Sequence, residues 1–242
     1  MGALGRQFIR SRGSSVWSPS TPSGLVAWWD FSDLAHIWAD TAGTTGTTNT
    51  GVIKRVDDKS GNGHNATEAT NAPTRLDNAQ NSKTGAVFTS GSSTKLASSG
   101  WTIAQPCTIA VWALSASTAN GVIVGGGTVN TRDIFYSAVP TGAVNVYSGT
   151  ALASGATYTA ANIHMLLGLF NGASSLVRVD GAETSGAAGT GAETNGLIIG
   201  AEGGPTSFAT VTVMEIAVYS NDIGSTHRGN AQTYGQSKYA AP

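Results

Sequence analysis

The side chains that can perform acid–base or nucleophilic chemistry are few in this sequence. Glycosidases hold two carboxyl groups roughly 5 to 10 Å apart, so two acidic residues on one strand face are the pattern to find. The longest strand-like segment contains one carboxylate, Glu215, and its alternate neighbours are the apolar Val213 and Ala217. Asp57 and Asp58 are adjacent, so they point to opposite faces of an extended chain. The sequence therefore offers no carboxylate pair on one face of a strand.

The remaining candidates for a nucleophile or a base are isolated. Cys107 lies within an apolar segment, which is typical of a buried structural cysteine. The four histidines lie in unrelated segments, and the sequence contains no zinc-protease, nucleophile-elbow or phosphate-loop motif. We therefore predict that the protein is not an enzyme.

The elements that must position any site are short strands, as the composition indicates. Of the 242 residues, 32 are glycine and only 11% are charged, against roughly 25% in an ordinary soluble domain. Long surface helices use Glu, Lys and Arg, so this composition favours short strands joined by tight turns.

Charge and hydropathy exclude several classes of partner. The net charge of −1 lacks the strongly basic footprint of a nucleic-acid-binding protein. No apolar run is long enough to span a bilayer, and a single cysteine cannot form an intrachain disulfide. The N-terminus contains no apolar stretch of signal-peptide length. We expect no nucleic-acid partner, no membrane insertion, and assembly in a cytoplasm.

About ten segments have the apolar or alternating pattern of strands, and turns such as Asn171-Gly172 and Asp180-Gly181 separate them. The segments are 24–31, 83–88, 107–114, 121–124, 134–136, 143–147, 163–170, 176–179, 197–199 and 210–219. Short strands at this spacing are typical of a β-sandwich or barrel. Helical spacing predicts one helix over 223–239, which its glycines weaken.

Residues 1–23 differ from the rest of the chain because they contain three arginines and no acidic residue. We predict an extended basic N-terminal arm over 1–23 and one domain over 24–242. Two interpretations of the arm remain open: a disordered terminus, or a segment that orders against a partner. The second would use the arginines as ion-pair donors and the aromatic residues as anchors. Its contact residues would be Arg6, Phe8, Arg10, Arg12 and Trp17.

Six segments match the motifs of a known family in order. They are 24–31 (GLVAWWDF), 56–67 (VDDKSGNGHNAT), 86–92 (AVFTSGS), 108–113 (TIAVWA), 176–181 (LVRVDG) and 214–219 (MEIAVY). Together they resemble the laminin-G-like, concanavalin A-like jelly-roll family, of the kind found in phage virion surface proteins. The resemblance implies an all-β, concanavalin A-like jelly-roll β-sandwich with an extended N-terminal arm and a short C-terminal helix.

Relatives in this family often bind Ca²⁺ at an edge of the sandwich through loop carboxylates and carbonyls. Asp58 and Asn62 match the family's loop motif, whereas Met214 stands where the closing strand usually supplies an acid. Its neighbour Glu215 is the remaining carboxylate. The resemblance therefore leaves open a Ca²⁺ site of Asp58, Asn62 and Glu215 or a loop held by hydrogen bonds alone. We expect no other cofactor.

A fold of this family normally works outside a cell, although this sequence contains no secretion signal and no disulfide. A phage virion protein reconciles these facts, because it assembles in the host cytoplasm and is released by lysis. We therefore expect a capsid decoration protein on the virion surface. Its arm would contact the major capsid protein or another virion protein. Its domain would form a homo-oligomer, for which we expect a trimer.

The alternative is a glycan-binding adhesin, such as a tail-fibre or head-fibre module that recognises a host surface polysaccharide. Its site would use exposed aromatic side chains in loops, with candidates Trp38, Trp101, Tyr136, Tyr147 and Tyr158. A glycoside hydrolase or lyase is a third and weaker interpretation, because it requires the carboxylate pair that the strand pattern lacks.

Overall fold

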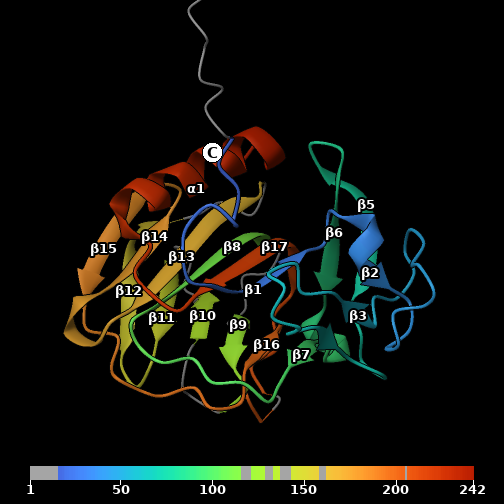
Figure 1. Ribbon diagram of the computed structural model, residues 1–242, viewed down its shortest axis with the longest axis horizontal. Helices are drawn as coiled ribbons and strands as arrows, with labels where there is room; N and C mark the ends of the chain where they lie inside the picture. The colour runs from blue at the N-terminus through green and yellow to red at the C-terminus, as the bar shows by residue number, and fades with distance from the viewer. Residues whose placement is uncertain (1–15, 116–120, 129–132, 137–142, 158–161, 205) are drawn as a thin grey trace, which may run out of the picture.

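The computed structural model describes residues 16–115, 121–128, 133–136, 143–157, 162–204 and 206–242. These residues form two antiparallel β-sheets and one α-helix at the end of the chain (Figure 1). The all-β sandwich with a C-terminal helix is therefore confirmed. No helix among the described residues is long and apolar enough to cross a membrane.

Sheet A contains eight strands. They are β1 (Leu25–Asp30), β5 (Thr74–Gln80), β6 (Lys83–Phe88), β8 (Cys107–Ser115), β13 (His164–Phe170), β14 (Ser175–Val179), β15 (Ala182–Gly186) and β17 (Val211–Tyr219). Their order is β15-β14-β13-β8-β17-β6-β5, and β1 pairs with β17 on the edge that β6 also uses. One edge of β17 is therefore shared by two strands that lie far apart in the sequence.

Sheet B contains nine strands. They are β2 (Ile37–Trp38), β3 (Arg55–Val56), β4 (Ala66–Thr67), β7 (Leu96–Ser98), β9 (Gly121–Gly126), β10 (Asp133–Tyr136), β11 (Ala143–Tyr147), β12 (Ala151–Thr157) and β16 (Leu197–Ile199). Their order is β12-β11-β10-β9-β16-β7-β4-β3-β2. Three short 3-10 helices complete the described elements, at Leu34–His36, Ser90–Ser92 and Gly172–Ser174.

The main core lies between the two sheets, because each strand turns alternate side chains inward. Trp29 of β1 and Phe88 of β6 are fully buried there, as are Val144 and Val146 of β11. Cys107 is buried in the same cluster, which agrees with the structural role predicted for it.

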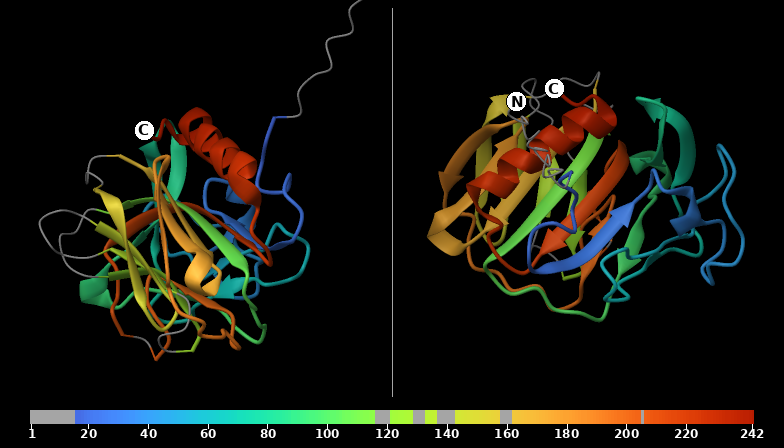
Figure 2. Two further views of the ribbon diagram at one scale, coloured as in Figure 1. Left: turned by 90° about the vertical axis from the view of Figure 1, so that its left-hand side faces the viewer. Right: turned by 45° about the horizontal axis from the view of Figure 1, so that its top comes forward.

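A second apolar cluster lies on the outer face of sheet A, where helix α1 (Gly224–Tyr239) covers it (Figure 2). Trp112 of β8, Met165 of β13 and Met214 of β17 are fully buried in this cluster. A sheet face exposed to water carries polar side chains at alternate positions. The nearly continuous apolar sequences of these strands therefore require a cover, and α1 supplies it.

The β5–β6 hairpin holds the C-terminal end of α1. Gln80 Nε2 donates to the carbonyl oxygen of Tyr239 at 2.7 Å, and Asn81 Nδ2 donates to that of Lys238 at 3.0 Å. These bonds satisfy carbonyl groups that a helix end leaves unpaired. They also fix the position of Lys238 and Tyr239 relative to sheet A.

A β-bulge in β17 decides which way its acidic residue points. The register between β17 and β8 shifts between Val213 and Glu215. Val213 and Ile216 face the core between the sheets, whereas Met214 lies in the cluster beneath α1. Since a bulge inserts one extra residue into a strand, Glu215 also lies on the side of α1.

Candidate functional site

The centre of the candidate site is a pair of carboxylates on neighbouring strands. Asp30 of β1 and Glu215 of β17 are directly opposite each other in the antiparallel register. Asp30 is 4% exposed and Glu215 is fully buried. The Lys238 ammonium of α1 bridges them, with Nζ 2.9 Å from Asp30 Oδ2 and 3.0 Å from Glu215 Oε2.

Glu215 accepts hydrogen bonds from four side chains. Trp28 Nε1 donates at 2.6 Å and Tyr239 Oη at 2.6 Å. Tyr234 Oη lies 3.1 Å from both carboxylate oxygens, and Lys238 supplies the fourth donor. A buried carboxylate is tolerated only when its lone pairs are satisfied in this way.

Asp30 lies at the more open end of the same network. Besides Lys238, it accepts from Ser32 Oγ at 2.6 Å and from Lys59 Nζ at 3.2 Å. Lys59 Nζ also contacts Asp33 Oδ2 at 2.6 Å, and it lies 4.6 Å from the centre of the Trp28 ring. Two lysines therefore contact the carboxylate pair, and Lys59 is shared with a third carboxylate, Asp33.

The environments of the two carboxylates displace their pKa values in opposite directions. Burial alone would raise the pKa of Asp30, but Lys238, the Ser32 hydrogen bond and Lys59 outweigh it and hold that pKa below 3.8. Burial and the nearby charge of Asp30 raise the pKa of Glu215 above its ordinary 4.5, against Lys238 and Tyr239. Pairs of carboxyl groups whose pKa values are displaced in opposite directions are found in acid–base catalytic sites as well as in structural networks.

A cavity of about 430 Å³ lies above this network, between α1 and the segment that precedes β1. Its lining residues are Val16, Trp17, Asn230, Thr233, Tyr234, Ser237 and Lys238. The volume falls in the range of roughly 300 to 1,000 Å³ that is typical of small-molecule sites. Tyr234 and Lys238 belong to both the cavity wall and the carboxylate network, so the two features form one site.

Trp17 was predicted to anchor the arm to a partner, and the structure places it against its own chain. Its indole Nε1 donates to His227 Nδ1 at 3.2 Å, and its ring meets the Tyr234 ring edge-on with centroids 5.4 Å apart. The other predicted arm contacts, Arg6, Phe8, Arg10 and Arg12, lie outside the residues that the structure describes.

The loop after β3 is held by Asp58, as its motif suggested. The Asp58 carboxylate accepts from the backbone N–H groups of Trp28, Ser60 and His64, each at 2.9 Å, and from Ser60 Oγ at 2.8 Å. Gly63 has φ +81°, the left-handed conformation expected for the residue that follows Asn62. Hydrogen bonds thus account for the shape of this loop.

The three predicted Ca²⁺ ligands all bind donors or acceptors of the chain itself. Asp58 uses both carboxylate oxygens to hold the loop, and Asn62 Nδ2 donates to the carbonyl oxygen of Val26 at 2.8 Å. Glu215 accepts from side chains of β1 and α1. Within the described part of the chain, no group of three or more His, Cys, Asp or Glu side chains is arranged to hold a metal ion. A Ca²⁺ site of Asp58, Asn62 and Glu215 stays a prediction.

The aromatic residues predicted as sugar platforms have other roles or lie elsewhere. Trp101 is 7% exposed and stacks against the His64 ring, with centroids 4.3 Å apart. Trp38 is half-buried and donates from Nε1 to Asp57 Oδ2 at 2.8 Å. Neither lines the cavity. The side chains of Tyr136 and Tyr158 fall outside the described part of the structure.

Sequence reasoning missed Asp30, Lys238 and Tyr234. Asp30 belongs to a segment that was predicted as a strand, but its partner on β17 is 185 positions away, by the numbering of the register pair. Tyr234 and Lys238 are four residues apart on a predicted helix and therefore share one of its faces. That spacing could have indicated that they belong to one site.

Solved structures of glycan-processing proteins contain the same fold. Neither protein-family models nor curated sequences match the chain. Trypanosoma rangeli sialidase in complex with sialic acid is 14% identical with a TM-score of 0.55, over 90% of this chain and 34% of that chain. A GH54 α-L-arabinofuranosidase soaked with a cyclic sulfate inhibitor is 14% identical with a TM-score of 0.61, over 90% of this chain and 64% of that chain. The likeness at these identities establishes the fold, and the chain spans about a third of the sialidase.

These comparisons correct the prediction that the protein is not an enzyme. The same β-sandwich occurs in chains of glycoside hydrolases, so the fold itself is compatible with such activity. The prediction rested on the absence of two carboxylates from one strand face. Asp30 and Glu215 form a pair across two strands, which a search along single strands does not detect.

Proposed function

We propose that this protein is a glycan-recognising β-sandwich domain whose sugar site is the cavity on α1. The observation that carries the proposal is the lining of that cavity. Two aromatic side chains, Trp17 and Tyr234, line the same space as the amide of Asn230 and the hydroxyls of Thr233 and Ser237. Apolar ring surfaces combined with a few polar groups that fix orientation are the general chemistry of small-ligand sites, and they match the apolar faces and hydroxyl edges of a sugar.

The charges around the cavity favour neutral sugar units. Lys238 is the one charged residue among the described lining residues, and two carboxylates already accept from its ammonium. An anionic sugar would have to compete with Asp30 and Glu215 for that ammonium. We therefore expect neutral oligosaccharides to bind more tightly than sialylated ones.

The comparisons support a role within glycan processing. The similar chains are named as a sialidase and an arabinofuranosidase, and this chain corresponds to part of each. We propose that the domain holds a polysaccharide on which the complete protein or assembly acts. The carboxylate pair of Asp30 and Glu215 lies beneath the cavity, so the domain itself is also tested for glycan hydrolysis in the binding experiment described below.

The proposed family and location follow from the sequence motifs. We propose that the domain belongs to the laminin-G-like, concanavalin A-like jelly-roll family and is displayed on a phage virion. The low charge and the basic residues 1–15 support this location. Sedimentation with undecorated capsid shells tests it: full-length protein should sediment at a fixed stoichiometry, whereas protein lacking residues 1–15 should remain in solution. Equal behaviour of the two forms would contradict an arm-mediated contact with the capsid.

A calorimetric titration tests the sugar site. The probes are arabinotetraose, cellohexaose, maltohexaose and sialyllactose, and release of reducing sugar is measured in the same samples. Trp17→Ala should weaken binding at least tenfold, which corresponds to about 1.4 kcal/mol. Trp38→Ala is the matched control, because Trp38 is also half-buried with its N–H bonded to one side chain, yet lies outside the cavity. Absence of binding by the intact protein, or equal loss in both variants, would contradict the proposal.

A further inference from the structure

One wall of the cavity does not belong to the sandwich. Val16 and Trp17 come from residues 16–23, here called the strap, whereas the other five lining residues are on α1. Figure 2 shows the strap, in blue, running from beside α1 to the start of β1. The cavity therefore has the observed shape only while the strap lies against the helix.

The strap is held at a few points. Pro19 and Pro22 are its buried residues, and the fully buried Tyr219 donates from Oη to the carbonyl oxygen of Pro19 at 2.9 Å. Trp17 adds its hydrogen bond to His227 and its ring contact with Tyr234. Within the described residues, the strap is not part of either sheet. Segments with few buried contacts and no sheet pairing open more readily than the core.

A glycine separates the strap from the sheet. Gly24 has φ +80°, a conformation that other residues rarely adopt, and its carbonyl oxygen accepts from the backbone N–H of Ser220 at 2.8 Å. From Leu25 onward the chain pairs with β17. Rotation at Gly24 would therefore move the strap without disturbing β1.

We propose that the strap gates the sugar site: docking of residues 16–23 completes the cavity, and a bound glycan locks the strap in place. This inference rests on the proposed function of the cavity. Because only the docked form has both walls, a glycan binds it and not the open form. Ligand binding then lowers the open population by the factor 1 + [L]/Kd, where [L] is the free glycan concentration.

The coupling between glycan binding and strap docking acts in both directions. A partner that pulls on the residues before Val16 and undocks the strap would release the glycan. The arrangement thus couples the N-terminal arm to the sugar site without direct contact between the arm's partner and the glycan.

Alkylation of a cysteine placed at Pro19 measures strap opening. Pro19 is buried where the strap contacts Tyr219, and it does not line the cavity. The Pro19→Cys thiol reacts with iodoacetamide when the strap leaves the domain, so its reaction rate follows the open population. With the tightest-binding oligosaccharide of the four probes at ten times its Kd, this rate should fall about elevenfold. Cys107, which is buried in the core, is the control and should react far more slowly in both conditions, because only unfolding exposes it.

A variant tests the anchor without altering the cavity lining. In the Pro19→Cys background, Tyr219→Phe removes the hydrogen bond to the carbonyl oxygen of residue 19 and should speed alkylation of the introduced thiol two- to tenfold in the absence of glycan, as expected for one hydrogen bond. Alkylation of Cys107 should remain far slower than that of the introduced thiol, which separates strap opening from unfolding.

The outcomes distinguish the gate from the site. If a glycan binds but alkylation at Pro19→Cys is unchanged at ten times the Kd, the gate is wrong and the sugar site stands. If Tyr219→Phe leaves that alkylation rate unchanged, the proposed anchor is wrong. If none of the four probes binds the intact protein, the sugar site itself is wrong, and the gate with it.

Discussion

Asp30 and Glu215 face each other across β1 and β17 and share the ammonium of Lys238, 2.9 Å from one carboxylate and 3.0 Å from the other. The lysine comes from α1, so this contact ties the helix to sheet A by charge as well as by apolar packing. Glu215 is fully buried, and a buried charge depends strongly on its partner. The contact therefore predicts that removal of the Lys238 ammonium lowers the free energy of unfolding.

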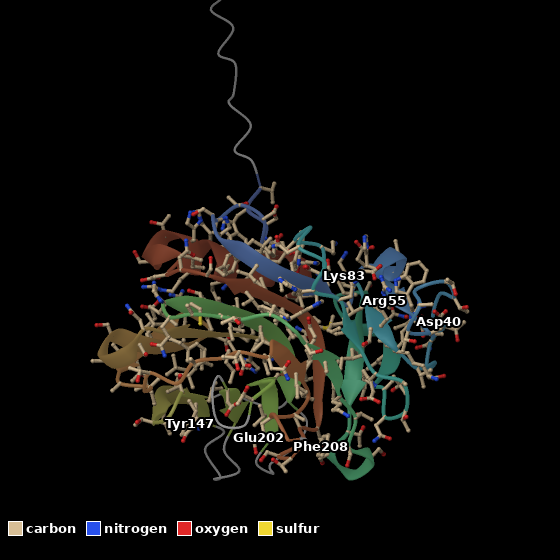
Figure 3. All side chains as sticks on the ribbon, turned by 60° about the horizontal axis from the view of Figure 1, so that its bottom comes forward. Asp40, Arg55, Lys83, Tyr147, Glu202 and Phe208 are labelled. Atoms are coloured by element: carbon tan, nitrogen blue, oxygen red, sulfur yellow. The ribbon has the colours of Figure 1, made fainter. Side chains whose placement is uncertain are left out.

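Lys238→Met should lower the free energy of unfolding by about 3 to 5 kcal/mol, because it leaves a buried carboxylate without its counter-charge. Urea unfolding followed by circular dichroism measures the change. Lys83→Met is the control. Lys83 begins β6 in the β5–β6 hairpin, has no ion pair among the described residues, and is labelled in Figure 3. Its replacement should cost within about 0.5 kcal/mol, and equal losses in both variants would contradict the role of Lys238.

Replacement by alanine should change the stability of the protein in opposite directions at two glycines of α1, Gly229 and Gly235. A Cβ at Gly235 would lie 2.5 Å from Trp112 Nε1, whereas one at Gly229 would meet nothing within 4 Å. Gly235→Ala should therefore destabilise the protein by about 1 to 3 kcal/mol through overpacking. Gly229→Ala should stabilise it by up to about 1 kcal/mol, because alanine is the better helix former. Thermal unfolding of the two variants checks both signs, and stabilisation by both would show that α1 lies farther from β8.

Stability should fall as the pH rises toward neutrality because of Asp133. Burial, and then the nearby charge of Glu202, raise the pKa of Asp133 from 3.8 to about 7. A folded-state pKa above the unfolded value stabilises the protein fully below pH 3.8, and this contribution is lost as the pH rises through about 7. Figure 3 shows Glu202 on the side of the molecule opposite Lys83.

Asp133→Asn isolates this effect, because the amide cannot ionise. The difference in unfolding free energy between wild type and variant should change by about 4 kcal/mol from pH 4 to pH 8, in the direction that favours the variant at high pH. Urea unfolding at several pH values measures it. A difference that stays constant with pH would mean that Asp133 is ionised throughout in the folded protein.

Asp58→Ala should destabilise the protein by about 2 to 4 kcal/mol, because three backbone N–H groups and one hydroxyl lose their acceptor. Asn62→Ala, which removes side-chain donors of the same loop, should cost about 1 kcal/mol. The wild-type melting temperature should also be the same in Ca²⁺ and in EDTA, since the Asp58 oxygens are already used. A rise of several degrees with Ca²⁺ would revive a metal site in this loop.

Local sequence patterns predicted the fold class and several elements. Low charge and abundant glycine indicated short strands, and the segment Lys83–Phe88 was predicted with the bounds that the structure has. The helix predicted over 223–239 begins one residue later. Local patterns suffice for such elements, because strand and helix periodicity is written in neighbouring residues. The role of Asp58 in its loop was also local, since most of its donors lie within six residues.

The candidate site, by contrast, depends on contacts between distant parts of the chain. The bulge after Val213 turned Glu215 toward α1, and the pairing of β1 with the far end of the chain set Asp30 opposite it. Folding of the strap against α1 made Trp17 a cavity wall. These contacts join residues 103 positions (Trp112 and Glu215), 185 positions (Asp30 and Glu215) and 210 positions (Trp17 and His227) apart. A one-residue shift of register reverses the face of a strand side chain. Local patterns located ten of the seventeen described strands and missed short or polar ones such as β5, β12 and β15. They contain no such long-range information, so the facing partners of each strand were decided by packing.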